Sequence, residues 1–427
     1  MTWLLALGLA QAFGAALPPT APPDEPLPTT VEGMKEETFA VARQLMNDYP
    51  RRTDPLGLLG TVYRQYGDTA EAVKCWERVL ARNPRRADAC HGLGMVALAK
   101  GEPEQAADYW RKAQEIDPRL PGVYGRYAMA LMEMGKLDEA VAALERELRN
   151  SPPANEWYHL LGQAHLQLRN YDKARDNYLK ALELRAEDSG TCYGLSLAYA
   201  RLGQAEKSRE YRERFQRIRS EEERASSARR RAEPDRVWAA RVLADTLRAA
   251  GVLYAADGAW WKAERHWRRA AALDPKNVLC RQHLVDLLVQ LRRTDEAIPF
   301  CEQLRTIDPK NPTYHLNTGV LLARVGRLDE AERALRASIE AAPQRAIGYY
   351  SLARLLMMAK DRLGEARDAA QKLVELEQTA GNYAVLAEAH YRAGDLASAR
   401  AALAEARKLN SVDREYLRVR QLVEEGK

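Results

Sequence analysis

The chain is poor in the residue patterns that most enzymes and metal-binding proteins need. Its five cysteines are odd in number and form no C-x-x-C pair. Also absent are the G-x-x-x-x-G-K-[ST], G-x-S-x-G and H-E-x-x-H motifs, which argues against a nucleotide-phosphate loop, a hydrolase nucleophile and a zinc-protease helix. The seven histidines are scattered, and His159 and His165 lie six residues apart, on opposed faces of a helix. We therefore expect no catalysis, no metal and no cofactor.

An excess of one charge is also missing. The 65 Lys and Arg residues face 60 Asp and Glu residues, which leaves a formal net charge of +5 with both signs interspersed. A dedicated nucleic-acid binder usually carries a strong positive field, so the composition argues against nucleic acid as the main partner. With 427 residues, 46% of them hydrophobic, the chain can bury a large core.

Long apolar runs are confined to the N-terminus. The stretch MTWLLALGLAQAFGAALPPTAPP carries no charge before Asp24 and is too short for a membrane-spanning helix. It resembles a secretory signal peptide, although it lacks a positive n-region. We predict a signal peptide at 1–16, a stiff Pro-rich spacer at 17–33 and a bacterial protein exported to the periplasm or beyond. A membrane anchor, a misplaced start and a cytoplasmic location stay open as alternatives.

What the sequence has in abundance is a repeat. Segments of equal length, such as GDTAEAVKCWERVLARNP and GEPEQAADYWRKAQEIDP, end in prolines spaced 34 residues apart: Pro50, Pro84, Pro118 and Pro152, then Pro275, Pro309 and Pro343. In most units a small residue recurs early, an Ala recurs later, and a large residue follows that Ala by four positions, as at Trp76, Trp110 and Trp267. This period and pattern resemble the tetratricopeptide repeat, a helix-turn-helix unit.

The resemblance implies an all-α fold, a right-handed tetratricopeptide-type α-solenoid in two blocks. We predict the N-terminal block at 34–222, a charged helical linker at 223–243, and the C-terminal block with a capping helix at 244–427. The linker follows from the distance between Pro152 and Pro275, which exceeds three periods by 21 residues. It should hold two long helices that meet at EPD, with Asp235 capping the second.

Local details follow from the register of the repeat. The small residues should let the two helices of one unit approach closely, and the large residues should fill the space between units. In GAWWKAERHWRRAAALDP, residues 258–275, Trp267 is therefore predicted to be core, while Arg265, His266 and Arg268 should face solvent. A disulfide between Cys280 and Cys301, in the two helices of one unit, stays an alternative to free buried thiols.

The resemblance also implies a binding surface, because first helices of such arrays line a concave face that holds extended peptides. The predicted positions in the N-terminal block are His91, Met95, Arg126, Met129, Met132, His159, Gln163 and Tyr193. Those in the C-terminal block are Gln282, Asp286, Asn317, Tyr350, Arg354 and Tyr391. The methionines indicate an adaptable apolar surface, with simple packing as the alternative.

The Lys/Asn/Arg set with which chaperone-binding members hold a terminal carboxylate is absent from the matching positions. We predict a protein-interaction scaffold whose partner is a protein or peptide. The alternatives are an accessory or regulatory subunit of an enzyme, and RNA binding through Arg229, Arg230 and Arg231 of the linker, which Glu221, Glu222 and Glu223 could instead neutralise.

Overall fold

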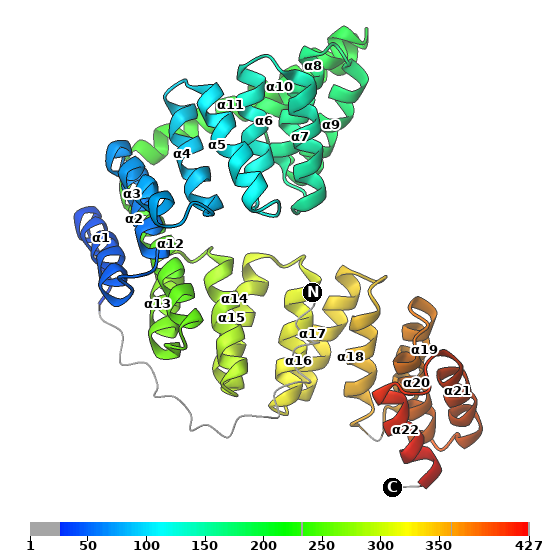
Figure 1. Cartoon of the computed structure of the whole chain (residues 1–427). Helices are drawn as coiled ribbons and strands as arrows, with labels where there is room; N and C mark the ends of the chain where they lie inside the picture. The colour runs from blue at the N-terminus through cyan, green and yellow to red at the C-terminus, as the bar shows by residue number, and fades with distance from the viewer. Residues whose placement is uncertain (1–25, 232–233, 360, 426–427) are drawn as a thin grey trace. The chain divides into compact units, whose positions relative to one another are not determined.

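The computed structural model describes residues 26–231, 234–359 and 361–425, without the side chains of 225–234 and 425. These residues form 22 helices and no strand (Figure 1), which confirms the all-α prediction. The predicted signal peptide at 1–16 and the first part of the spacer lie outside the described residues. So do the side chains of Arg229, Arg230 and Arg231.

Contacts divide the chain into two compact units, one ending at Leu253 and the other beginning at Tyr254. The N-terminal unit contains α1 (Val31–Asp48), α2 (Asp54–Gln65), α3 (Thr69–Arg82), α4 (Ala87–Ala99), α5 (Pro103–Ile116), α6 (Val123–Glu133), α7 (Leu137–Asn150), α8 (Asn155–Gln167), α9 (Tyr171–Leu184), α10 (Ser189–Arg201) and α11 (Ala205–Arg231). The division itself falls inside α12 (Pro234–Ala256), C-terminal to the linker that the sequence predicts.

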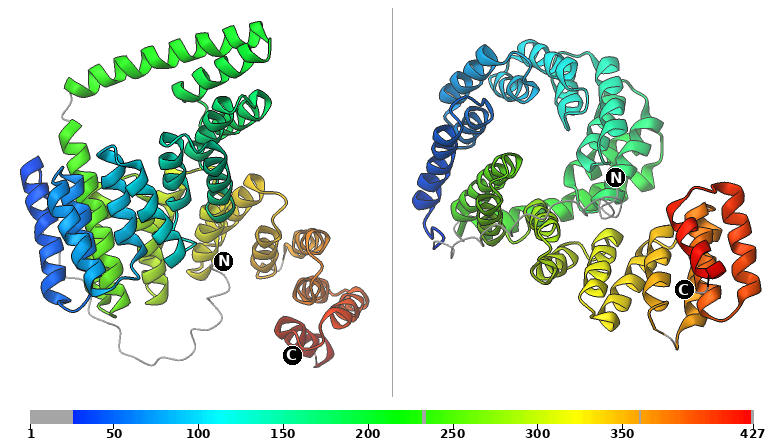
Figure 2. Two further views of the ribbon diagram at one scale, coloured as in Figure 1. Left: turned by 45° about the horizontal axis from the view of Figure 1, so that its top comes forward. Right: turned by 60° about the horizontal axis from the view of Figure 1, so that its bottom comes forward.

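The C-terminal unit continues with the remaining helices. They are α13 (Trp260–Leu273), α14 (Val278–Gln290), α15 (Thr294–Ile307), α16 (Pro312–Arg324), α17 (Leu328–Ala341), α18 (Ala346–Leu356), α19 (Leu363–Leu376), α20 (Ala380–Arg392), α21 (Leu396–Leu409) and α22 (Arg414–Glu425). Figure 2 shows the helix pairs of each unit following one another along the chain.

The turn inside each pair depends on backbone conformation. Gly67, after α2, has φ 86°, and Gly101, after α4, has φ 77°, a left-handed region that glycine enters without steric cost. The second helix then starts within a few residues, with Asp68 accepting a hydrogen bond from the Glu71 amide as N-cap of α3. A tight glycine turn therefore folds α3 back on α2 and α5 back on α4, and a side-chain cap also begins α3.

Large rings sit where the repeat places them, and the small residues also make room for these rings. A Cβ on Gly60 would lie 2.8 Å from the Trp76 ring, and one on Gly92 of the next pair would lie 2.5 Å from the same ring. Gly94 stands in the same relation to Trp110, at 2.8 Å. Gly60 and Gly92 thus make room for an indole held between two successive first helices, whereas Gly319 also allows close approach to the second-helix Ala331, whose carbonyl oxygen would lie 3.0 Å from an added Cβ.

The linker region has the two long helices that the register predicts. α11 spans 27 residues and α12 spans 23. The expectation that Asp235 caps the second helix is wrong, because α12 begins at Pro234 and Asp235 already lies in its first turn. Proline is well suited to that first helical position, since its missing N–H would have no partner there.

The tryptophan-rich helix α13 confirms one prediction and overturns another. Trp267 is buried at 4% exposure and its ring stacks on His283, with centroids 4.8 Å apart. His266, however, does not face solvent: its Nδ1 donates to the Lys262 carbonyl at 2.7 Å, and its ring packs against Tyr254 at 5.0 Å. Burial lowers the pKa of His266 to about 4.

Arg268 is also partly enclosed, because Glu264 one turn earlier is buried and forms an ion pair with it at 2.8 Å. The buried carboxylate of Glu264 attracts the Arg268 guanidinium toward the core. The register of the repeat does not predict this ion pair. All five cysteines are buried and unbridged, so Cys280 and Cys301 form no disulfide in this structure.

Candidate functional site

The first helices of successive pairs lie closer together than the second helices. Contacts join α2 to α4, α4 to α6, α6 to α8 and α8 to α10 in the N-terminal unit, and α16 to α18 and α18 to α20 in the C-terminal unit. Comparable contacts between successive second helices are absent from the described residues. A stack whose first helices crowd together curves toward them, so the first-helix face is the concave face of each unit.

His91 on α4 lies on this face as a neutral group. Its Nδ1 accepts a hydrogen bond from Nε1 of Trp110 at 3.2 Å, and because tryptophan can only donate, the ring proton of His91 must be on Nε2. Burial, followed by the positive charges of Arg126 and Arg64, lowers the pKa of His91 to about 4. His91 therefore presents a neutral N–H donor at physiological pH.

Arg126 on α6 is held in place from three sides. Its guanidinium stacks over the Trp157 ring at 5.7 Å, pairs with Glu156 at 3.2 Å, and donates from Nη1 to the sulfur of Met129 at 3.2 Å. Arg126 and Met129 are both half-buried, so they form a fixed polar and apolar pair near the middle of the unit.

The remaining predicted positions of the N-terminal unit follow along the same face. Nδ1 of His159 on α8 is hydrogen-bonded to the Thr191 hydroxyl at 2.9 Å, and burial lowers its pKa. Tyr193 on α10 is 49% exposed and packs its ring against Phe215 at 5.3 Å. Three more predicted side chains, all half-buried, are Met95, Met132 and Gln163.

One residue of this face was missed by the sequence reasoning. Arg64, at the end of α2, is half-buried, and burial followed by the charge of Arg126 lowers its pKa. The signal was available, because Arg64 lies two periods of 34 residues before Met132, which was selected. Extending the register back by those two units would have found it.

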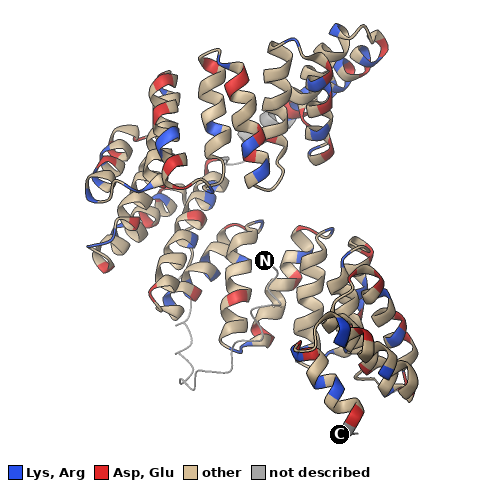
Figure 3. Ribbon diagram, turned by 45° about the vertical axis from the view of Figure 1, so that its right-hand side comes forward, with Lys and Arg blue, Asp and Glu red and all other residues tan. Residues whose placement is uncertain are grey.

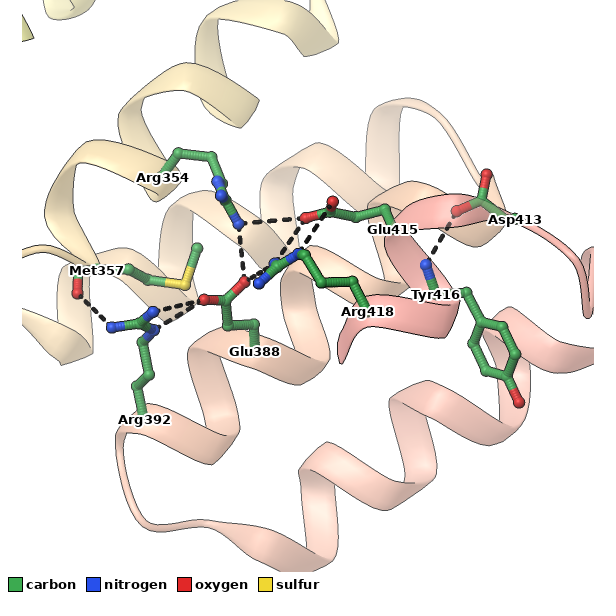
Figure 4. A network of polar contacts seen from close by, with 8 residues as sticks. All are labelled: Arg354, Met357, Glu388, Arg392, Asp413, Glu415, Tyr416 and Arg418. Carbon is green, nitrogen blue, oxygen red and sulfur yellow. Dashed lines mark hydrogen bonds and ion pairs between the residues drawn. The ribbon is translucent and has the colours of Figure 1, made fainter. Parts of the chain in front are cut away.

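In the C-terminal unit, Arg354 is occupied by the chain itself. Its Nη1 donates to Glu388 of α20 at 2.8 Å and to Glu415 of α22 at 3.2 Å (Figure 4). Glu388 is buried and is further paired with Arg418 of α22 and with Arg392. The predicted ligand-facing Arg354 therefore helps to attach the C-terminal helix to α18 and α20.

The other C-terminal positions are less engaged. Gln282 on α14 donates to the Tyr314 hydroxyl at 3.2 Å. The Asp286 side chain, one turn further on, is exposed and makes no hydrogen bond or ion pair with the described residues. The half-buried side chains of this set are Asn317 on α16, Tyr350 on α18 and Tyr391 on α20.

Replacing Glu388 by Gln is expected to loosen α22. Burial opposes ionisation of Glu388, but hydrogen bonds from Arg418 and Arg392 and the charge of Arg354 outweigh it and lower its pKa. Gln has nearly the volume of Glu388 but lacks the negative charge that pairs with Arg354, Arg392 and Arg418. Amide protons of α22 should then exchange at least tenfold faster at neutral pH, measured by mass spectrometry.

The pH dependence gives this prediction a second readout. A lowered folded-state pKa stabilises the fold above the ordinary value of 4.5, and this contribution is lost as the pH falls through the lowered pKa. Exchange in α22 of the wild type should therefore accelerate in acid, whereas Glu388→Gln should lack that step. Glu405→Gln, on the exposed surface of α21, is the control. Unchanged α22 protection in Glu388→Gln would contradict the role of this network.

Lys and Arg alternate with Asp and Glu over both units (Figure 3). The described residues contain no group of three or more His, Cys, Asp or Glu side chains that could hold a metal ion. None of the described helices combines the length and apolar character needed to cross a membrane.

Comparisons with known proteins found distant similarities. The chain is 22% identical over 187 residues to anaphase-promoting complex subunit 3 of Schizosaccharomyces pombe, covering 44% of this chain and 25% of that protein. It thus spans about a quarter of the length of this relative. Among solved structures, MamA is 21% identical, with 39% of this chain and 96% of MamA covered and a TM-score of 0.37. Yeast Tom70 is 15% identical, with 89% of this chain and 96% of Tom70 covered and a TM-score of 0.34.

Family models described as tetratricopeptide repeats match most of the two units. They cover residues 58–121, 128–190, 254–317, 316–383 and 383–405. These ranges contain the helix pairs whose glycines enclose Trp76 and Trp110, and they include α13 with Trp267. The chain belongs to the tetratricopeptide repeat family.

Proposed function

We propose that this protein is an interaction scaffold that holds an extended segment of a partner protein on the concave face of its N-terminal unit. The family supports a protein-interaction role, since its repeats present extended concave binding surfaces. We choose this surface because Arg126 and Met129 are both half-buried and hydrogen-bonded to each other. They offer a partner segment a polar and an apolar contact side by side. Export of the protein remains part of the proposal and rests on the leader sequence alone.

The C-terminal unit is less suited to this task. Two of its groups on the same face, Arg354 and Glu388, are already committed to α22. In the N-terminal unit, by contrast, the methionines at 95, 129 and 132 are partly exposed and can adapt to an incoming chain. Binding energy concentrates in central residues that lose water, so Met129 is the position to test.

Replacing Met129 by Glu is expected to weaken peptide binding at least tenfold, about 1.4 kcal/mol. The probe is a library of random peptides displayed on phage and selected on the full-length chain, with the affinity of selected peptides measured by fluorescence anisotropy. The matched control is Ala142→Glu, which places the same charge on the exposed side of α7.

Circular dichroism must show both variants folded. The proposal is wrong if no peptide is selected, or if selected peptides bind Met129→Glu as tightly as wild type.

A further inference from the structure

Arg64 is a guanidinium without a partner on the concave face. It is half-buried at the C-terminal end of α2, and within the described residues its side chain makes no hydrogen bond and no ion pair. Removing a charged group from water without pairing it costs free energy. The cost is increased here by Arg126, whose charge acts on Arg64 from α6. Of these two like charges, Arg126 has an acidic partner in Glu156, whereas Arg64 has none among the described residues.

The acidic groups that act on His91 or pair with Arg126 are engaged elsewhere. Glu156 pairs with Arg126 at 3.2 Å, and Asp88 pairs with Arg86 at 2.6 Å. Glu147 accepts hydrogen bonds from three backbone amides at the start of α6. None of these carboxylates pairs with Arg64, so its partly exposed guanidinium is open to an anion from another molecule.

The three donors come from three successive first helices: Arg64 from α2, His91 from α4 and Arg126 from α6. His91 contributes a neutral Nε2–H, because its Nδ1 accepts from Trp110. The helix that carries His91, α4, contacts both α2 and α6, and the positive charges of the two arginines contribute to the lowered pKa of His91. A planar guanidinium fork with a neighbouring N–H donor matches the two oxygens of a carboxylate.

We propose that Arg64, together with Arg126 and His91, binds the side-chain carboxylate of an Asp or Glu residue within the partner segment. This inference rests on the proposed function and names the chemistry of its partner. Because Arg126 already shares its charge with Glu156, the site offers about one free positive charge, which suits a carboxylate better than a phosphate of nearly two negative charges.

The experiment uses the same phage selection on the full-length chain. Wild-type protein should enrich peptides with Asp or Glu at one position. Synthetic copies with both ends blocked should bind at least tenfold more weakly to Arg64→Glu, and addition of salt should weaken wild-type binding. Replacing the enriched acid of the peptide by Gln or Asn should lower its affinity for the wild-type protein by the same factor. The same replacement should leave its affinity for Arg64→Met unchanged, as expected for a direct pair.

Arg78→Glu, which makes the same charge change on the exposed side of α3, is the control and should bind as wild type does. Peptides that require Met129 but show no acidic enrichment, or that bind Arg64→Glu unchanged, would overturn the carboxylate site and leave the proposed function intact. Competition by millimolar inorganic phosphate as strong as that by the acidic peptide would also overturn it. Failure to select any peptide would overturn both proposals.

Discussion

Trp267→Ala is expected to lower the free energy of unfolding by about 3–5 kcal/mol, the range for removing a buried aromatic side chain from a core. The ring is 4% exposed, and it stacks on His283 of the following first helix. Its loss removes packing between α13 and α14. The measurement is urea unfolding followed by circular dichroism, where the midpoint should fall without an increase in slope.

The control lies in the same helix. Trp260 is the first residue of α13 and is only half-buried, so Trp260→Ala should cost far less. Equal and small losses for the two variants would show that Trp267 does not join α13 to its neighbour in solution. Equal and large losses would indicate that Trp260 also packs between helices.

Glu147→Ala is the second change with a large expected effect. Glu147 is 1% exposed on α7, and it accepts hydrogen bonds from the amides of Gly122 at 2.8 Å, Tyr124 at 3.1 Å and Gly125 at 3.3 Å. These are orphan donors at the start of α6, where the helix dipole also favours a negative charge. Removing the carboxylate leaves buried donors unpaired, so we expect a loss of about 3–5 kcal/mol.

Glu147→Gln and Glu145→Ala complete this test. Gln keeps one carbonyl acceptor and should recover part of the loss, whereas Glu145 is exposed on the same helix and its removal should change little. Hydrogen exchange of the α6 amides gives the local readout, and they should be the first to lose protection. Unaltered α6 protection in Glu147→Ala would contradict the capping role.

The sequence predicts the contact of Trp267 but not the contacts of Glu147. Trp267 was predicted as core because it shares a register position with Trp76 and Trp110, and burial repeats with the period. Glu147 was not singled out, because its partners lie more than twenty residues away and are backbone amides, which carry no residue signature.

The sequence by itself determined the helices, their pairing and the first-helix positions, because spacing of 34 residues and a small-residue pattern act locally within one or two repeats. Tertiary structure alone decided which charged groups on those positions are free. The register predicts that Arg354 and Arg126 both face a ligand. Arg354, however, donates a hydrogen bond to Glu415 of α22, which lies 61 residues further along the chain. Arg64 has no hydrogen bond or ion pair among the described residues, and Asp88, Glu147 and Glu156 pair with other groups. Charge pairing depends on which side chains meet in space, and a repeat period specifies position but not the identity of a distant neighbour.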